Sequence, residues 1–196
     1  MFHLNNGHSI ILASESTRRV DLLRTLGIPF SIIPPSINEE RKKGETPKDY
    51  VRRISMEKAM TIAKFFPDKW VIGADTVVVH KNRLIGKPEN EEDAYRTLKM
   101  LKGKWHKVIT GFSIVNIEKN VYHTDSVETK VFLKDLSDEE IVRYIKTCEP
   151  FGKAGSYAIQ GKGGFMVKEI RGSYANVVGL PICELVEALQ SLGIVS

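Results

Sequence analysis

Short apolar runs alternate with segments of helical periodicity along the chain, and this alternation limits the possible folds more than any other feature. Residues 9–13 are typical of a buried strand, and from Ser16 onward apolar residues recur at helical spacing. The alternation continues to a last helix expected at residues 181–192. One antiparallel hairpin interrupts it, because 107–117 and 121–133 are two strand-like runs separated by a short polar turn. We therefore expect an α/β fold with an elongated mixed sheet and flanking helices.

The remaining elements follow from the same patterns. Capping residues predict helix starts at Thr46-Pro47, Asn90 and Ser137. Further strands are expected at 30–33, 70–79 and 165–170, the second of them as a strand pair or a bulged strand.

The size and composition of the chain agree with one globular unit. The chain has 196 residues, of which 42% are hydrophobic and 27% are charged, enough to bury a sizeable core. No internal repeat, low-complexity tract or linker divides it. We predict a single domain over residues 1–196, with two lobes around a cleft.

The cysteines and the N-terminal segment indicate a cytoplasmic protein. Cys148 and Cys183 lie far apart and show no metal-ligand spacing, which suits free thiols in a reducing compartment. The first residues contain no basic segment before a long apolar run, so we expect neither a signal peptide nor a membrane helix.

The net charge leaves several partners open. A formal charge of +5 agrees with a nucleic acid, with a phosphorylated small molecule, or with no anionic partner at all. The chain has no dense block of lysine and arginine with interleaved aromatic residues, so a dedicated nucleic-acid binder is disfavoured.

The segment ILASESTRR, residues 11–19, predicts an anion site. A strand that turns into a helix through small hydroxyl residues offers free backbone N–H groups, and Ser14 adds a hydroxyl. Arg18 and Arg19 stand at the positive end of the helix dipole, where cations are disfavoured unless an anion is present. The alternative is that both arginines point to solvent and that Ser14 or Ser16 only caps the helix.

Lys58 lies on the apolar stripe of the helix that begins at Pro47. It follows Val51 by seven residues and precedes Ile62 by four, so its ammonium must either snorkel to the edge or meet a partner. We weigh snorkelling against a lysine that faces a bound anion.

Asp75 stands in the apolar run VIGADTVVV, where an unpaired carboxylate is costly to bury. Such an acid suits a general base or a metal ligand. An exposed carboxylate at a bulge or strand end is the alternative. Thr76 follows directly and could hydrogen-bond beside it.

Two glycine-containing turns carry lysines that a ligand could approach, Lys87 in Gly-Lys-Pro and Lys153 in Gly-Lys-Ala-Gly-Ser. Glu39, Glu40 and Glu128 could help to hold a divalent cation, although exposure is the default for all three. The five histidines show no zinc-binding spacing. From the residues alone we expect a hydrolase or transferase that acts on a polyphosphate.

At these residues the chain resembles the Maf nucleotide pyrophosphatases, also called septum formation inhibitor Maf proteins. The matching segments occur in the family's order over about 170 residues: ILASESTRR, VIGADTVV, GKP, VITGF, VETKV, KAGSYAIQG and GSYANVVGLP. The resemblance implies a fold similar to that of the inosine triphosphate pyrophosphatases, with a deep cleft between two lobes and a homodimer. It also implies hydrolysis of a nucleoside triphosphate to the monophosphate and pyrophosphate with a divalent metal, Mg²⁺ or Mn²⁺.

The resemblance also implies roles for single residues. Asp75 matches the proton acceptor of the family, and Glu39 is the candidate metal ligand. Positions tied to substrate choice are Arg18, Thr76 and Gln160. The residues that line the phosphate site are Ser14, Arg19, Lys58 and Lys87. The AIQG form of the segment at 158–161 resembles the subgroup that acts on dTTP and UTP.

This chain departs from the family pattern at three points. Thr17 replaces the usual proline before the arginines, and Gly152 replaces the aspartate expected before Lys-Ala-Gly. The acidic pair expected after the second strand is Asn38-Glu39. Two other functions stay open, a non-catalytic nucleotide- or partner-binding regulator of cell division and an RNA or DNA binder. We expect no stable nucleic-acid partner.

Overall fold

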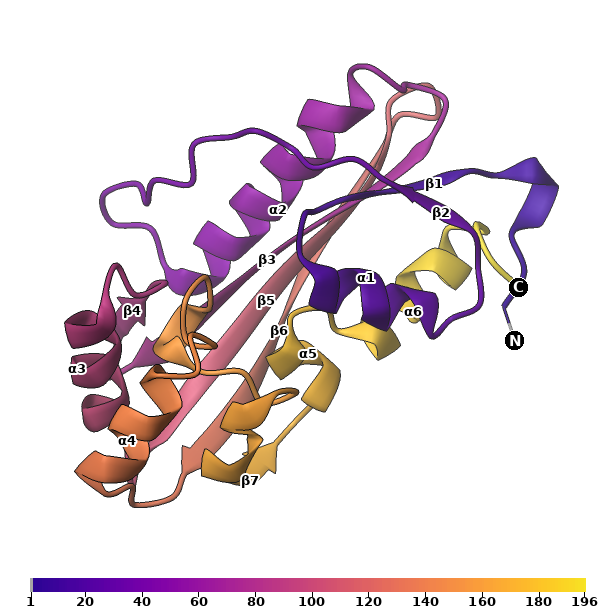
Figure 1. The fold of residues 1–196 in the computed structure, drawn as a ribbon. Helices are drawn as coiled ribbons and strands as arrows, with labels where there is room; N and C mark the ends of the chain where they lie inside the picture. Colours follow the sequence, from indigo (N-terminus) through magenta and orange to yellow (C-terminus); the bar gives the residue numbers. More distant parts are fainter. Residues whose placement is uncertain (1) are drawn as a thin grey trace. The chain divides into compact units, whose positions relative to one another are not determined.

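The computed structural model describes residues 2–196, and its helices and strands alternate as the sequence predicts (Figure 1). The strands are β1 (Ile10–Ala13), β2 (Phe30–Ile32), β3 (Trp70–His80), β4 (Arg83–Ile85), β5 (Trp105–Asn116), β6 (Val121–Leu133) and β7 (Val167–Arg171). The α-helices are α1 (Thr17–Arg24), α2 (Pro47–Ala63), α3 (Glu91–Leu101), α4 (Asp138–Ile145), α5 (Tyr174–Val178) and α6 (Ile182–Ser191). Three short 3₁₀ helices span Asn5–Gly7, Ala154–Ser156 and Lys162–Met166.

The predicted helix starts are confirmed by their caps. The Thr46 hydroxyl accepts a hydrogen bond from the Asp49 amide at 3.2 Å, with Pro47 at the first helical position. Asn90 caps α3 in the same way. Ser137 and Glu140 form a reciprocal capping box at the start of α4.

The mixed sheet with flanking helices is also confirmed. The strand order is β2-β1-β3-β5-β6-β7, and β4 pairs with β3 outside this path. β1 is parallel to both β2 and β3, whereas β4 is antiparallel to β3 and β7 is antiparallel to β6. The two strands of the predicted hairpin, β5 and β6, are neighbours in the sheet.

Some expected boundaries were wrong. β3 is one continuous strand of 11 residues, whereas we expected a strand pair or a bulged strand. The strand expected from 165 begins at Val167, because the preceding residues form a 3₁₀ turn. The five-residue helix α5 is too short to produce a readable periodicity.

The chain forms two compact units, each assembled from separate segments. The first comprises residues up to 75, with 110–127 and 179–196; the second comprises 76–109 and 128–178. The single domain expected over the whole chain stays a prediction.

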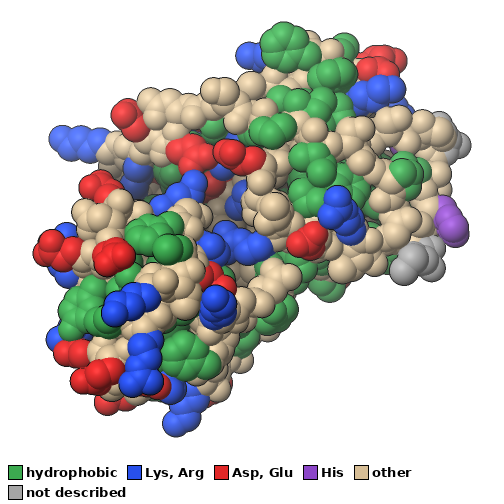
Figure 2. All heavy atoms as spheres, in the orientation of Figure 1, with side chains coloured by type: hydrophobic (Ala, Val, Ile, Leu, Met, Phe, Trp, Pro, Cys, Tyr) green, Lys and Arg blue, Asp and Glu red, His purple; other side chains and the backbone are tan. Residues whose placement is uncertain are grey.

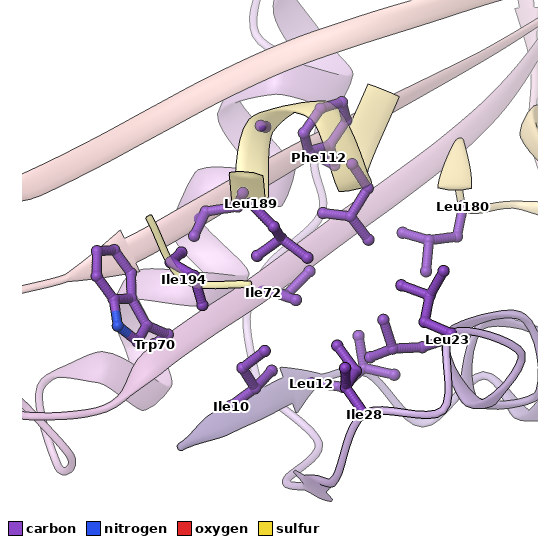
Figure 3. Packing of buried hydrophobic residues seen from close by; sticks show 14 of the residues in the cluster. Ile10, Leu12, Leu23, Ile28, Trp70, Ile72, Phe112, Leu180, Leu189 and Ile194 are labelled. Atoms are coloured by element: carbon purple, nitrogen blue, oxygen red, sulfur yellow. The ribbon is translucent and has the colours of Figure 1, made fainter. Parts of the chain in front are cut away.

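In the first unit, alternate residues of the strands pack on opposite faces of the sheet. Ile10, Leu12 and Ile72 belong to a core that includes residues of α1 and α6 (Figure 3). Ile11 and Val71 pack instead with residues of α2. Apolar burial on both faces explains why β1 and β3 are nearly continuous apolar runs. A separate core in the second unit is formed by α3, α4 and the strand residues around them.

Candidate functional site

The turn from β1 into α1 brings Ser14 to the start of a helix, as the segment ILASESTRR predicts. α1 begins at Thr17, and Ser16 occupies its N-cap position without a side-chain capping bond. The first turn of α1 contains no acidic residue, so no carboxylate of the helix lies at the positive end of its dipole. The Ser14 hydroxyl accepts a hydrogen bond from the Ser16 amide at 3.2 Å, and Ser14 is buried.

Arg19 is held at this turn rather than pointing freely to solvent. Its Nε donates to the Gly179 carbonyl at 2.8 Å, and its Nη1 lies 3.5 Å from the Ser14 hydroxyl. Burial lowers the pKa of the Arg19 guanidinium; Asp75 opposes this shift, and Arg18 adds to it. Arg18 is partly buried beside it. The alternative of two solvent-directed arginines is therefore wrong for Arg19.

Lys58 is paired, not snorkelling. Its Nζ donates to Asp75 Oδ1 at 2.7 Å and lies 2.8 Å from Glu39 Oε1. Lys58 is only 8% exposed and Asp75 only 7%, so each partner offsets the cost of burying the other. This also rejects the alternative of an exposed carboxylate at position 75.

Two glycines explain why α2 reaches Asp75. A Cβ at Gly73 of β3 would lie 2.2 Å from the Ser55 carbonyl oxygen, and one at Gly111 of β5 would lie 2.4 Å from the Val51 carbonyl oxygen. Because neither glycine has a side chain, the backbone of α2 approaches both strands closely. Asp75 has the same strand parity as Gly73, so it faces the helix that carries Lys58.

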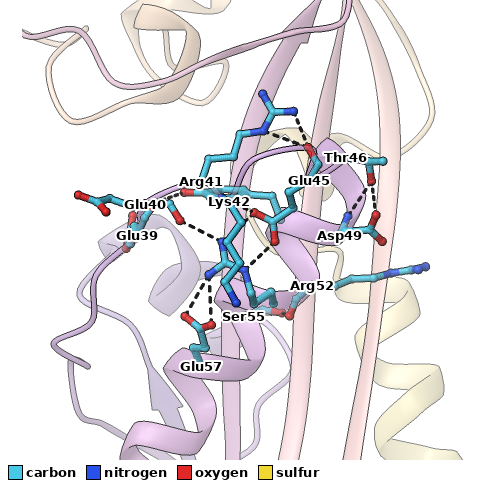
Figure 4. Close-up of polar contacts among 12 residues, drawn as sticks. Glu39, Glu40, Arg41, Lys42, Glu45, Thr46, Asp49, Arg52, Ser55 and Glu57 are labelled. Carbon is cyan, nitrogen blue, oxygen red and sulfur yellow. Dashed lines mark hydrogen bonds and ion pairs between the residues drawn. The ribbon is translucent and has the colours of Figure 1, made fainter.

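The loop that carries Glu39 is fastened to the start of α2. The Tyr50 hydroxyl donates to the Glu39 carbonyl at 2.7 Å. Burial, together with the negative charges of Asp75 and Glu39, raises the pKa of Tyr50 to about 12. Arg53 donates to the Glu40 carbonyl at 3.0 Å. Figure 4 shows Glu39 and Glu40 in this loop beside α2.

Arg53 also binds the end of the same loop, through a bidentate contact with a carboxylate. Its Nε and Nη2 donate to the two carboxylate oxygens of Glu45 at 2.6 and 2.8 Å, and its Nη1 donates to Glu57. The hydrogen bond from Arg53 lowers the pKa of Glu45 to about 2. The Glu39 backbone is therefore fixed, although its side chain is 40% exposed.

Asp75 and Glu39 are the carboxylates that could contribute to binding a divalent cation, and both contact the Lys58 ammonium. Among residues 2–196, no group of three His, Cys, Asp or Glu side chains could hold a metal ion on its own. Mg²⁺ commonly uses one or two carboxylates and completes its shell with water and substrate phosphates. Asp75 and Glu39 are two carboxylates with a common partner in Lys58, and Glu39 remains our predicted metal ligand.

In the second unit, the structure joins the two lysine-bearing turns. Lys87 is exposed in the turn after β4, and the Gly86 carbonyl beside it accepts a hydrogen bond from the Gly155 amide at 3.1 Å.

Thr76, the residue after Asp75 in β3, is partly buried. Gly152 has a φ of +73°, a conformation in which glycine avoids strain that the expected aspartate would carry.

Gln160 lies in a turn. The Gly161 amide bonds to the Ala158 carbonyl at 3.2 Å, and Gln160 is exposed between them.

The sequence did not identify the residues that hold the site segments in place, which are Gly179, Tyr50, Arg53, Tyr144 and Glu149. Only Glu149 had a local signal, as an acid directly before a proline and the glycine-rich segment.

Basic and acidic side chains lie next to one another over the face that Figure 2 shows. The ion pairs Arg53–Glu57 and Lys99–Asp138 are examples of this mixing in the chain. Over the described residues, no helix is both long and apolar enough to cross a membrane.

The fold and the site define an α/β protein in which a buried carboxylate pairs with a buried lysine and acts electrostatically on a buried arginine. The Ham1 protein of Staphylococcus aureus has a similar structure, with a TM-score of 0.55 and 12% identity over 94% of this chain and 99% of that one. At this identity the likeness shows the fold alone.

The family model of the Maf-like proteins matches residues 9–192, and the chain belongs to this family. A protein of Syntrophus aciditrophicus (strain SB) named dTTP/UTP pyrophosphatase is 48% identical over 94% of this chain and 90% of its own length. A protein of Geobacter sp. (strain M21) with the same name is 49% identical over 94% of this chain and 96% of its own length. The resemblance noted in the sequence is confirmed.

Proposed function

We propose that this protein is a nucleoside triphosphate pyrophosphatase that hydrolyses dTTP and UTP to the monophosphate and pyrophosphate. The observation that carries the proposal is the buried Lys58–Asp75 pair beside Arg19, in a chain of the Maf-like family. The names of its relatives support the choice of dTTP and UTP.

The phosphate chain of the substrate binds, in this proposal, where β1 turns into α1. The start of α1, the Ser14 hydroxyl and the guanidinium of Arg19 are suited to phosphate oxygens. Arg18 adds positive charge, and Lys87 stays a further predicted contact to the phosphates. Ser14 and Arg19 are held in place before the substrate arrives, and fixed dipoles and charges stabilise a transition state without a reorganisation cost.

Asp75 acts as the general base. The oxygen of a water molecule bonds to the α-phosphorus while the bond from that phosphorus to the bridging oxygen breaks, and pyrophosphate leaves. One proton of the water passes to the Asp75 carboxylate. Lys58 fixes that carboxylate through the 2.7 Å contact. A divalent cation held by Asp75 and Glu39 would neutralise phosphate charge when bound.

Gln160 recognises the base. Its carboxamide offers one donor group and one acceptor, which can pair with the O4 and N3–H edge of uracil or thymine. Thr76 is the second candidate for substrate choice. We also propose that the protein is a cytoplasmic homodimer and that it has no stable nucleic-acid partner. Light scattering after size exclusion tests the dimer.

A panel of triphosphates tests this function. The purified protein is incubated with Mg²⁺ or Mn²⁺ and dTTP, UTP, CTP, dCTP, ATP or GTP, and the released pyrophosphate is measured. We expect dTTP and UTP to give the highest kcat/KM, with little distinction between ribose and deoxyribose. A preference for ATP or GTP, or no release of pyrophosphate from any of them, would contradict the proposal.

A further inference from the structure

The segment around Gln160 has little regular structure to hold it. Residues 157–161 form no helix or strand, and a single 3₁₀ turn, Lys162–Met166, follows them. A side chain that must distinguish one base from another has to be held in a narrow range of positions, because a misplaced amide loses its discrimination. The contacts that fix the backbone here therefore bear directly on substrate choice.

Glu149 fixes the backbone after Gln160. Its Oε1 accepts a hydrogen bond from the Lys162 amide at 2.9 Å, and its Oε2 accepts one from the Gly163 amide at 2.8 Å. Burial raises the pKa of the Glu149 carboxyl, but the hydrogen bonds from these two amides and from Tyr144 outweigh burial, and the pKa lies below its usual value. The carboxylate is thus in its charged, accepting form at neutral pH.

Tyr144 connects the same carboxylate to the backbone before Gln160. Its hydroxyl donates to Glu149 Oε2 at 2.8 Å and accepts a hydrogen bond from the Ala158 amide at 3.1 Å. Tyr144 is buried in the last turn of α4, with its ring 6.4 Å from that of Phe165. The hydroxyl is therefore anchored by a packed ring.

The glycines of the segment fit around these two side chains. A Cβ at Gly161 would lie 2.1 Å from Glu149 Oε1, and a Cβ at Gly163 would lie 2.7 Å from the Tyr144 hydroxyl oxygen. No other residue type could occupy either position without displacing the carboxylate or the hydroxyl. The glycines are thus needed for the close approach of this backbone to Glu149 and Tyr144.

We propose that Glu149 and Tyr144 are positioning residues that hold the backbone on both sides of Gln160 and thereby set substrate choice. Neither residue needs to touch the substrate. Glu149 holds Lys162 and Gly163, Tyr144 holds Ala158, and their mutual hydrogen bond makes the two contacts one unit. This inference rests on the proposed role of Gln160 in recognising uracil and thymine.

Cytosine is the informative competitor, because it presents the opposite donor and acceptor pattern to uracil. A Gln160 side chain on a backbone that is held in one place meets the base from one position, whereas on a released backbone it can reach the polar edge of either base. Release of the segment should therefore lower discrimination between UTP and CTP more than it lowers turnover of UTP.

The test uses Glu149→Gln and Tyr144→Phe in the full-length protein, with Glu92→Gln as the matched control. The amide of Glu149→Gln has one oxygen for three donors and presents its NH₂ group to at least one backbone N–H. Tyr144→Phe keeps the packed ring and removes only the hydroxyl. Glu92 is an exposed carboxylate on α3 that pairs with Arg96 at 3.6 Å.

For both variants we expect the UTP-to-CTP ratio of kcat/KM to fall by about tenfold or more, through KM more than kcat. Amide hydrogen exchange at residues 158–163 should become faster in both, and the melting temperature of Tyr144→Phe should stay near that of the wild type. Glu92→Gln should change none of these quantities. In the double variant, the loss in the UTP-to-CTP ratio, expressed as a free energy, should be smaller than the sum of the losses in the two single variants, because the residues act as one unit.

Two results would overturn the inference in distinguishable ways. If the wild type prefers UTP and dTTP but both variants keep the UTP-to-CTP ratio within about twofold while exchange accelerates, positioning is refuted and the proposed function stands. If the wild type shows no preference for UTP and dTTP, the proposed role of Gln160 fails, and this inference fails with it.

Discussion

At the scale of single residues, the buried pair of Lys58 and Asp75 is the main chemical feature of the site. Each is buried to a degree that its charge would not tolerate alone, and Glu39 gives Lys58 a second carboxylate partner. A carboxylate fixed in this way can receive a proton at a defined position, and the ammonium beside it compensates for the burial of its charge. The pair is therefore suited to general-base chemistry on a charged substrate.

Removing the base should remove most of the activity. Asp75→Asn keeps the shape of the side chain and an oxygen for Lys58, but it cannot accept a proton from water. We expect kcat to fall by about 10²–10⁴. Steady-state kinetics with UTP, on protein whose folding is verified by circular dichroism, measures this loss. Activity within about threefold of the wild type would exclude Asp75 as the base.

Removal of the Arg18 side chain should affect substrate binding and turnover without affecting stability. Arg18→Ala should raise KM and lower kcat for UTP, since positive charge near the phosphates stabilises them most in the transition state. The melting temperature should change little, because a cation leaves the positive end of α1. Arg24→Ala, in the last turn of the same helix, is the matched control and should leave the kinetics unchanged. A large loss of melting temperature with unchanged kinetics would assign Arg18 a structural role.

At the scale of elements, the approach of α2 to the sheet sets the geometry of the Lys58–Asp75 pair. Gly73 and Gly111 lie on neighbouring strands, and both face the backbone of this helix. The loop before α2 is fastened by Tyr50 and Arg53, so Glu39 approaches Lys58 from a fixed backbone.

A methyl group at Gly73 should push the helix away. Gly73→Ala places a Cβ 2.2 Å from the Ser55 carbonyl oxygen, and we expect a loss of about 1–3 kcal/mol in the free energy of unfolding. Turnover should fall as well, because the shift separates Lys58 from Asp75. Urea denaturation and UTP kinetics measure the two effects. Gly86→Ala, where a Cβ meets nothing within 4 Å, is the control for stability; equal stability of the two variants would refute the packing argument.

Local patterns predicted most of these elements, whereas long-range contacts did not. The caps at Thr46 and Ser137 and the alternation of strands and helices depend on neighbouring residues, so they could be read directly. The sequence singled out Lys58 and Asp75 as unusual but gave no sign that they pair. The contact of Arg19 with Gly179 joins residues 160 positions apart, which no local pattern encodes.

At the scale of the whole molecule, His106 links stability to pH. It is buried in the second unit, where Nε2 lies 2.8 Å from the Tyr157 hydroxyl oxygen. Burial, with a smaller effect of His80, lowers the pKa of His106 to about 4. In the unfolded chain its pKa is near 6.5, so the unfolded state takes up the proton first as the pH falls.

The stabilising contribution of neutral His106 is therefore complete above about pH 6.5 and is lost as the pH falls to about 4. At 1.36 kcal/mol per pKa unit, the loss is about 3 kcal/mol. His106→Gln removes the titration and should flatten the pH dependence of the unfolding free energy across this interval. Urea denaturation at a series of pH values measures it. Identical slopes for the variant and the wild type would show that His106 is not buried in its neutral form.

The central claim, that water attacks the α-phosphorus of a pyrimidine triphosphate, is tested most directly by following the oxygen of the water. UTP is hydrolysed in ¹⁸O-labelled water, and the products are identified by mass spectrometry. We expect UMP that carries the heavy oxygen together with unlabelled pyrophosphate, and the same pattern for dTTP. Label in pyrophosphate or orthophosphate, formation of UDP, or the absence of turnover would contradict it.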